Sequence, residues 1–335
     1  MNNQNNQSTI GPMIIISSLF FIFGFVTWLN SLLIPYLKIA CELTEVQSYL
    51  VTFAFYIAYL VMAPISTWVL NKFGFKNGMA VALGIMAVGA LCFIPAAFTR
   101  TYIIFLAGLF IMGGGLAILQ TASNPYITVI GPVETAAKRI SILGICNKLA
   151  GAIATTLFGY LLKVDEVDKL QQEIENLSPA EFTAALDKMA LEVVNPYIGI
   201  IAVLLILAFW VSKANLPEVK GDGEEEVVSD TAETKQSIFD FPHVLLGFVA
   251  LFLYVGVEVL AGDTIISYGT YLNIPLATSK FFPWITMLSM IAGYIIGIIA
   301  IPKYFSQEKA LKVCAILGLI LTVGIVFTDG IVSLT

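Results

Sequence analysis

Charge is scarce in this chain. Of its 335 residues only 12% are charged, whereas 58% are hydrophobic. A typical soluble domain has about 25% charged residues. A water-soluble fold could not enclose so much apolar surface, because its outer layer must remain largely polar. The composition therefore argues against an ordinary soluble domain and favours lipid as the surrounding solvent.

Residues that build metal centres and common catalytic sites are also scarce. Histidine occurs once, as His243, so neither a zinc site nor a Ser-His-Asp triad can be assembled around it. The four cysteines, Cys41, Cys92, Cys146 and Cys314, are far apart, and no pair has metal-ligand spacing. We interpret them as small apolar residues. No cluster of catalytic groups supports a membrane enzyme, the least favoured alternative.

A nucleic-acid surface and a secretion signal are missing as well. The net charge is −6, and no basic patch with interleaved aromatic residues is present. We therefore expect no nucleic-acid partner. Residues 1–8 are polar and uncharged, and no small-residue cleavage site precedes the first apolar run. We expect no cleaved signal peptide.

Long apolar runs occupy most of the chain. A helix needs about 20 apolar residues to cross the hydrocarbon of a bilayer, and backbone groups in lipid must be paired within the helix. The sequence therefore predicts an all-α polytopic membrane protein with about nine spans. The predicted spans are 12–37, 47–70, 78–98, 101–124, 139–162, 194–213, 243–266, 281–301 and 309–328.

Lysine and arginine in the loops predict the orientation, because cytoplasmic loops carry an excess of both. With the N-terminus inside, the short outer loops carry only Lys38, Arg100 and Lys280. We therefore predict a cytoplasmic N-terminus and a place in the cell (inner) membrane. The inner loops then hold Lys72, Lys76, Lys138, Arg139, Lys213, Lys220, Lys235, Lys303, Lys309 and Lys312.

Residues 163–193 form a long hydrophilic stretch with helical spacing. Ser178 begins an S-x-x-E capping box with Glu181, which is typical of a helix N-terminus. We predict an external helical hairpin that lies on the membrane surface.

A second hydrophilic stretch, residues 214–240, is acidic and almost free of aromatic residues, so we predict a mobile cytoplasmic linker. Six spans before a linker and further spans after it are typical of a transporter built from two repeated halves. We assign 1–213 to an N-terminal six-helix bundle and 241–335 to the start of a C-terminal bundle. That second bundle is cut short after about three spans if the halves match.

Several glycines are expected to have local roles. Gly74 lies in NKFGFKN, residues 71–77, between two apolar runs, and allows a tight turn. The GGG run at 113–115 lets neighbouring helices approach closely. It is no phosphate loop, since no strand precedes it and no Lys-Ser/Thr pair follows.

Two long motifs carry a family resemblance. They are FFIFGFVTWLNSLLIPYLK at 20–38 and LAILQTASNPYITVIGP at 116–132, and the similarity continues through Asn147 and YVGVEV at 254–259. Together they resemble the fucose permease and glucose/galactose transporter family of the major facilitator superfamily. The resemblance implies the major facilitator fold of two six-helix bundles. It also implies a monosaccharide site between the bundles, and uptake by alternating access coupled to a proton or sodium gradient, without a cofactor.

Two departures from the fucose permease pattern affect coupling. That pattern has an Asp where this chain has Ser31 and a Glu where it has Gln120. Those carboxylates are the expected proton carriers, so the resemblance leaves proton coupling open. Gln at the second position resembles the glucose/galactose type and points away from fucose.

Ionisable residues inside spans are candidates for coupling, because each costs about 2.5–3.5 kcal/mol on insertion scales. Lys148, Glu258 and Asp263 qualify, and Ser31 is added because it occupies the position of an acid. The two acids are five residues apart, which offsets them by roughly 140° on a helix, so they face different directions. We predict that Lys148 pairs with one of them and takes part in coupling; the alternative is a static ion pair.

Polar and aromatic side chains in the spans are candidates for a sugar site. Amides donate and accept at once, as sugar hydroxyls require, and aromatic rings can stack on a sugar. The alternatives are hydrogen bonds between helices for the amides and ordinary packing for the rings. The predicted sugar-binding residues are Asn30, Gln120, Asn124, Asn147, Trp28 and Tyr254.

Other functions remain open. The substrate could instead be N-acetylglucosamine or another small solute. The absence of both expected carboxylates also leaves a sugar uniporter and a non-transporting sugar sensor open. We expect a monomer in the lipid bilayer.

Overall fold

The computed structural model describes residues 10–130, 136–173, 178–214, 216, 241–301 and 303–328. Every regular element in these ranges is a helix, which confirms the predicted all-α class. The helices are α1 (Ile10–Trp28), α2 (Asn30–Ala40), α3 (Glu45–Ser48), α4 (Leu50–Leu91), α5 (Phe93–Thr99), α6 (Tyr102–Val129), α7 (Ala136–Leu161), α8 (Val164–Glu173), α9 (Pro179–Glu192), α10 (Val194–Lys213), α11 (Pro242–Tyr271), α12 (Leu276–Ser279), α13 (Phe282–Ala300) and α14 (Gln307–Phe327).

Eight helical segments in the described ranges are long and apolar enough to cross a membrane. One of them, Glu45–Thr99, has 55 residues, which is about 80 Å of helix and far more than one crossing needs. Its chain reverses at Gly74, where φ is 74° and ψ is 167°. The two arms of α4 are therefore separate crossings, in agreement with about nine predicted spans, and Gly74 makes the predicted turn.

The first span, Ile10–Ala40, runs through α1 and α2. Helix α1 ends at Trp28, and α2 begins at Asn30 and continues to Ala40. The short interruption falls at Leu29, whose carbonyl still accepts from the N–H groups of Leu32 and Leu33 at 3.1 Å each. Trp28, Asn30 and Ser31, three predicted site residues, adjoin this position, where Leu29 keeps helical backbone angles (φ −63°, ψ −27°).

Helix α6 packs against both arms of α4, as the glycine run predicted. A Cβ at Gly113 would lie 2.2 Å from the Phe55 carbonyl oxygen, and one at Gly115 would lie 2.8 Å from the Ala82 carbonyl oxygen. Side chains at these positions would force the helices apart. The prediction that the GGG run permits close helix approach is confirmed.

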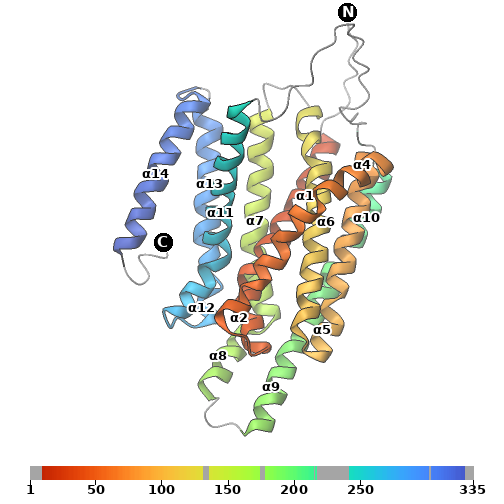
Figure 1. Ribbon diagram of the computed structural model, residues 1–335, viewed down its shortest axis with the longest axis vertical. Coiled ribbons are helices and arrows are strands. Elements are labelled where there is room, and N and C mark those ends of the chain that lie inside the picture. Colours follow the sequence, from red (N-terminus) through yellow and green to blue (C-terminus); the bar gives the residue numbers. More distant parts are fainter. Residues whose placement is uncertain are drawn as a thin grey trace, which may run out of the picture.

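The predicted hairpin at 163–193 is helical. Helices α8 and α9 form its two arms, and residues 174–177 between them lie outside the described ranges. Ser178 and Glu181 make the predicted capping box. The Tyr36 hydroxyl donates to the Met189 carbonyl at 2.7 Å, which anchors α9 to α2. Figure 1 shows α8, α9 and α12 at one end of the molecule, which we name the hairpin end.

Two groups of spans lie side by side. The first group comprises the helices from α1 to α10 and the second those from α11 to α14. In Figure 1, α11, α13 and α14 stand on one side, α4, α6 and α10 of the first group stand on the other, and α7 of the first group lies next to the second group. Contacts between the groups are made chiefly by α13 with α7 and by α11 with α2. The predicted linker lies almost wholly outside the described ranges, which lack 215 and 217–240.

Candidate functional site

Trp28 lies at the junction of α1, α7 and α11. Its side chain is buried, and glycines make room for it on both neighbouring helices. A Cβ at Gly151 would lie 2.5 Å from Trp28 Cδ1, and a Cβ at Gly262 would lie 1.8 Å from Trp28 Cζ3. The indole thus fills a gap between the first span and the second group of helices.

Lys148 and Glu258 form an ion pair beside this indole. Lys148 Nζ lies 2.5 Å from Glu258 Oε1 and 4.4 Å from the centre of the Trp28 ring. The lysine side chain is 6% exposed and the glutamate side chain 20%. Of the two partners predicted for Lys148, the structure shows Glu258. The pair joins α7 to α11 and therefore links the two groups of spans.

Asn147 is held by bonds between helices. Its Oδ1 accepts from Trp28 Nε1 at 3.4 Å, and its Nδ2 donates to the Phe20 carbonyl at 3.3 Å. A Cβ at Gly24 would lie only 1.8 Å from the Asn147 carbonyl oxygen, so α1 and α7 touch at the backbone here. In this arrangement the amide orients Trp28; its predicted contact with sugar stays a prediction.

Asp263 faces another direction, as its helical offset from Glu258 predicted. It is 1% exposed, and its Oδ2 accepts from Thr52 Oγ at 3.1 Å. Asn30, on α2, is also 1% exposed. Neither Asp263 Oδ1 nor Asn30 Nδ2 has a hydrogen-bond partner within the described part of the chain. Ser31 Oγ donates to the Trp28 carbonyl at 2.8 Å.

Of the remaining predicted sugar-binding residues, two lie on α6, whereas Tyr254 interacts with Glu258 of the ion pair on α11. Gln120 and Asn124 stand one turn apart on α6; Gln120 is half-buried and Asn124 exposed. Tyr254 is 61% exposed and lies one turn before Glu258 on α11. Their roles stay predictions.

Two contacts between the groups of spans were not predicted. Trp284 Nε1 on α13 donates to Thr156 Oγ on α7 at 2.6 Å. A Cβ at Gly144 would lie 2.6 Å from Tyr294 Cζ, so this tyrosine also rests on α7. Trp284 and Tyr294 are aromatic residues in an apolar run, which alone does not distinguish packing from function.

A cluster at the hairpin end also joins the two groups. The Asp168 carboxylate on α8 accepts from the backbone N–H groups of Leu276 and Ala277 at 2.9 and 2.8 Å, and so caps α12 from another helix. Lys280 Nζ lies 3.3 Å from Asp165 Oδ1 and 4.3 Å from the Tyr160 ring centre. We name these contacts the hairpin latch.

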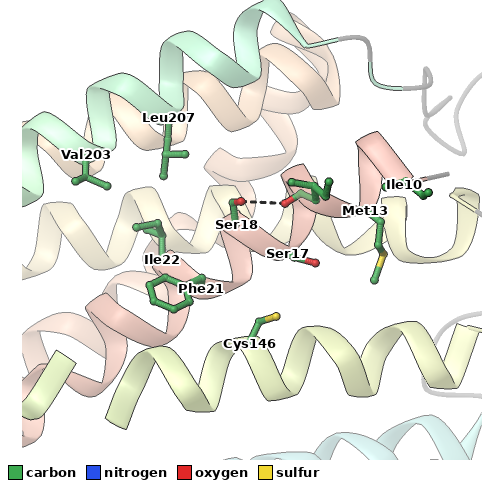
Figure 2. Close-up of a pocket in the computed structure, with 10 residues that line it drawn as sticks. Ile10, Met13, Ser17, Ser18, Phe21, Ile22, Cys146, Val203 and Leu207 are labelled. Carbon is green, nitrogen blue, oxygen red and sulfur yellow. Dashed lines mark hydrogen bonds between the residues drawn. The ribbon is translucent and has the colours of Figure 1, made fainter. Parts of the chain in front are cut away.

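Two cavities differ in character. Figure 2 shows one of about 650 Å³ between α1, α7 and α10, lined mainly by apolar side chains. Its Ser18 hydroxyl donates to the Ile14 carbonyl of its own helix at 2.9 Å, so the lining offers little to a sugar. The other, of about 810 Å³, opens at the hairpin end between α2 and α11 and includes Lys38, Thr264 and Ser267.

The comparisons with known proteins agree with this architecture. Residues 16–335 match the sequence profile of the Major Facilitator Superfamily. The chain is 31% identical over 319 residues to the glucose/galactose transporter of Brucella abortus, covering 94% of this chain and 73% of that protein. It is 30% identical over 334 residues to the L-fucose-proton symporter of Escherichia coli, covering 98% of this chain and 76% of that protein.

A solved structure shares the fold. The crystal structure of the E. coli fucose:proton symporter superimposes with a TM-score of 0.73 at 26% identity, covering 98% of this chain and 80% of that chain. A second structure of that transporter, in the outward conformation, gives a TM-score of 0.70 at 27% identity. The profile match over nearly the whole chain decides the assignment: this multi-pass membrane protein belongs to the Major Facilitator Superfamily of transporters.

Proposed function

We propose that the protein takes up a monosaccharide by cation-coupled symport. The observation that carries this proposal is the similarity over nearly the full chain to proteins named glucose/galactose transporter and L-fucose-proton symporter. The substrate belongs to this class of small neutral sugars. The coupling ion is a proton or sodium, and the cycle uses no other cofactor.

The site geometry supports such a mechanism. Trp28 fills the junction of the two groups of spans, with the Asn147 amide held against it. The Lys148–Glu258 pair crosses the same junction. Sugar hydroxyls need neighbouring donors and acceptors, and binding can favour one state only through contacts that differ between states. Groups that cross the junction are those whose contacts change when the halves move.

The hairpin latch supports alternating access. A transporter of this kind opens its site to one side at a time by rocking one bundle against the other. Asp168 and Asp165 precede the linker, whereas α12 and Lys280 follow it, so the latch holds the halves together at one end. We propose that the latch breaks when that end opens.

The proposal includes the location and organisation of the protein. It lies in the inner membrane as a monomer with a cytoplasmic N-terminus, so that the hairpin end faces outward. Residues 1–213 form the first bundle, 214–240 the linker and 241–335 the start of the second. The loop charges support this orientation, because lysine and arginine concentrate at the opposite end.

Counterflow in proteoliposomes tests transport and identifies the substrate. Vesicles preloaded with unlabelled glucose, galactose, fucose or N-acetylglucosamine are diluted into a trace of the same labelled sugar. We expect a transient overshoot of label for glucose or galactose. An overshoot with N-acetylglucosamine alone would change the substrate class. Binding without counterflow for every sugar would contradict transport and favour a sensor.

A further inference from the structure

Asp263 stands out among the buried polar groups of the described chain because one of its oxygens is satisfied and the other is not. Oδ2 accepts from the Thr52 hydroxyl at 3.1 Å, whereas Oδ1 is buried without a hydrogen-bond partner. No lysine, arginine or histidine among the described residues forms an ion pair with it. An ionised carboxylate buried in this way is strongly disfavoured, so the group must gain a proton or a cation.

The surroundings of Asp263 fit a proton better than a metal cation. Hard cations such as calcium and magnesium take about six or more oxygen ligands. Here Thr52 donates its hydroxyl hydrogen to the carboxyl group, and the buried Asn30 side chain presents an unpartnered amide donor on the helix packed against α11. A hydroxyl that donates to the carboxyl group stabilises the ionised form after the proton leaves.

Asn30 and Asp263 lie on α2 and α11, two helices that pack against each other. The Trp28 ring packs on Gly262, the residue before Asp263, and Asn30 follows Trp28 by two positions. Their unpartnered atoms are complementary, because one is a donor and the other an acceptor. The ionised and neutral forms of Asp263 would therefore favour different arrangements at a junction between the halves.

A route for the proton leads from the hairpin end. Ser267 lies one turn beyond Asp263 on the same face of α11, and its buried hydroxyl also has no hydrogen-bond partner in the described ranges. Ser267 lines the cavity of about 810 Å³ that opens at that end. Its hydroxyl can both donate and accept, as a step between solvent and a buried carboxyl requires.

Other titratable groups on the helices packed around Asp263 are engaged elsewhere or are hydroxyls. Tyr56, one turn after Thr52 on α4, is close enough to interact electrostatically with Asp263. The charged groups are paired as Lys148 with Glu258, Lys38 with Glu45 and Lys280 with Asp165, and the Tyr36 hydroxyl donates to Met189.

From this geometry we propose that Asp263, with Thr52, Asn30 and Ser267, is the proton-carrying site that couples transport to a proton gradient. The proposal rests on the proposed function for its role in coupling, but not for the existence of the site. The carboxyl takes a proton through Ser267 from the hairpin end and releases it when the halves rearrange. No bond other than O–H forms or breaks.

The test compares the intact protein with Asp263→Asn, and uses Glu308→Gln as the control because Glu308 is an exposed acid at the start of α14. We expect Asp263→Asn to keep counterflow and to lose accumulation under an imposed proton gradient by at least about tenfold, as expected when only the driving step is lost. Glu308→Gln should keep both. Unchanged accumulation by Asp263→Asn would overturn the proposal. It would also be overturned if a sodium gradient drove accumulation by the unaltered protein and Asp263→Asn abolished it.

Infrared spectroscopy tests the site without transport. Near pH 6, exposed carboxyls with pKa values of about 4 are ionised, so a protonated-carboxyl band reports buried acids. We expect a band that Asp263→Asn removes and Glu308→Gln retains. Thr52→Val, which removes the hydroxyl that donates to Asp263 Oδ2, should keep the band to higher pH. If no sugar shows counterflow but the band behaves as expected, the proposed function fails and the proton site stands. A carboxyl band that Asp263→Asn leaves unchanged overturns the proton site.

Discussion

Removing the Asp168 carboxylate should open the hairpin end. Its two oxygens accept from two backbone N–H groups of α12 at 2.9 and 2.8 Å. Hydrogen bonds to a charged group contribute about 1.5–3 kcal/mol each, and loss of a helix cap costs about 0.5–2 kcal/mol. Because Asp168 is partly exposed and water can replace it, we take about 2 kcal/mol for both bonds together.

This free energy sets the size of the expected shift. About 2 kcal/mol changes the ratio of open to closed molecules roughly 30-fold, so an open state populated at about 1% would rise to roughly a quarter. Asp165→Ala removes one longer contact, at 3.3 Å, from a carboxylate that is 59% exposed, but it also leaves the buried Lys280 ammonium without its acid. Its effect on the ratio therefore tests the ion pair separately from the cap.

Spin labels at Lys169 and Thr278 can measure this opening, since both positions are exposed and lie on opposite sides of the latch. In a background with the native cysteines replaced, Asp168→Ala should add a longer distance between the labels. Glu166→Ala is the matched control, because Glu166 pairs with Lys188 inside the hairpin and not across the halves. Equal distance distributions in the two variants would refute the role of the latch.

Two further predictions concern the Trp28 junction. Lys148→Ala should destabilise the protein by about 3 kcal/mol in thermal unfolding, because it leaves a largely buried acid unpaired, and Lys148→Ala/Glu258→Ala should recover most of that loss. Sugar accumulation that survives in Lys148→Ala would contradict a coupling role for this residue. Gly262→Ala should cost about 1–3 kcal/mol through collision with Trp28, whereas Gly256→Ala, with open space around it, should be neutral. Added Trp28→Phe should restore stability to Gly262→Ala; no recovery would show that the collision is not the cause.

Local features of the fold could be predicted from the sequence because each depends on neighbouring residues. Apolar runs determine the spans. Ser178 and Glu181, three positions apart, form the capping box of α9, and Gly74 permits a backbone turn. The packing of both arms of α4 against α6 depends on contacts between distant residues that composition does not reveal.

The candidate site was only partly predictable. A lysine in a span requires an acidic partner, and the sequence offers Glu258 and Asp263 for Lys148. Helical pitch shows that the two acids face different directions but does not show which of them faces Lys148. Choosing Glu258 required the tertiary arrangement that brings α11 within side-chain reach of α7. The Asp168 cap on α12 spans more than one hundred positions in the chain, and an acid in a hydrophilic stretch gives no local sign of it. Contacts between the halves are therefore the part that sequence alone did not supply.

Accumulation of sugar against its own gradient tests the central claim most directly. Proteoliposomes that hold the protein would receive the labelled sugar identified by counterflow, under an inward proton gradient or an inward sodium gradient imposed separately, each with a matching ionophore as control. Our account predicts accumulation above the outside concentration under the proton gradient, which the ionophore abolishes. Equilibration without accumulation under either gradient would contradict symport and identify a uniporter.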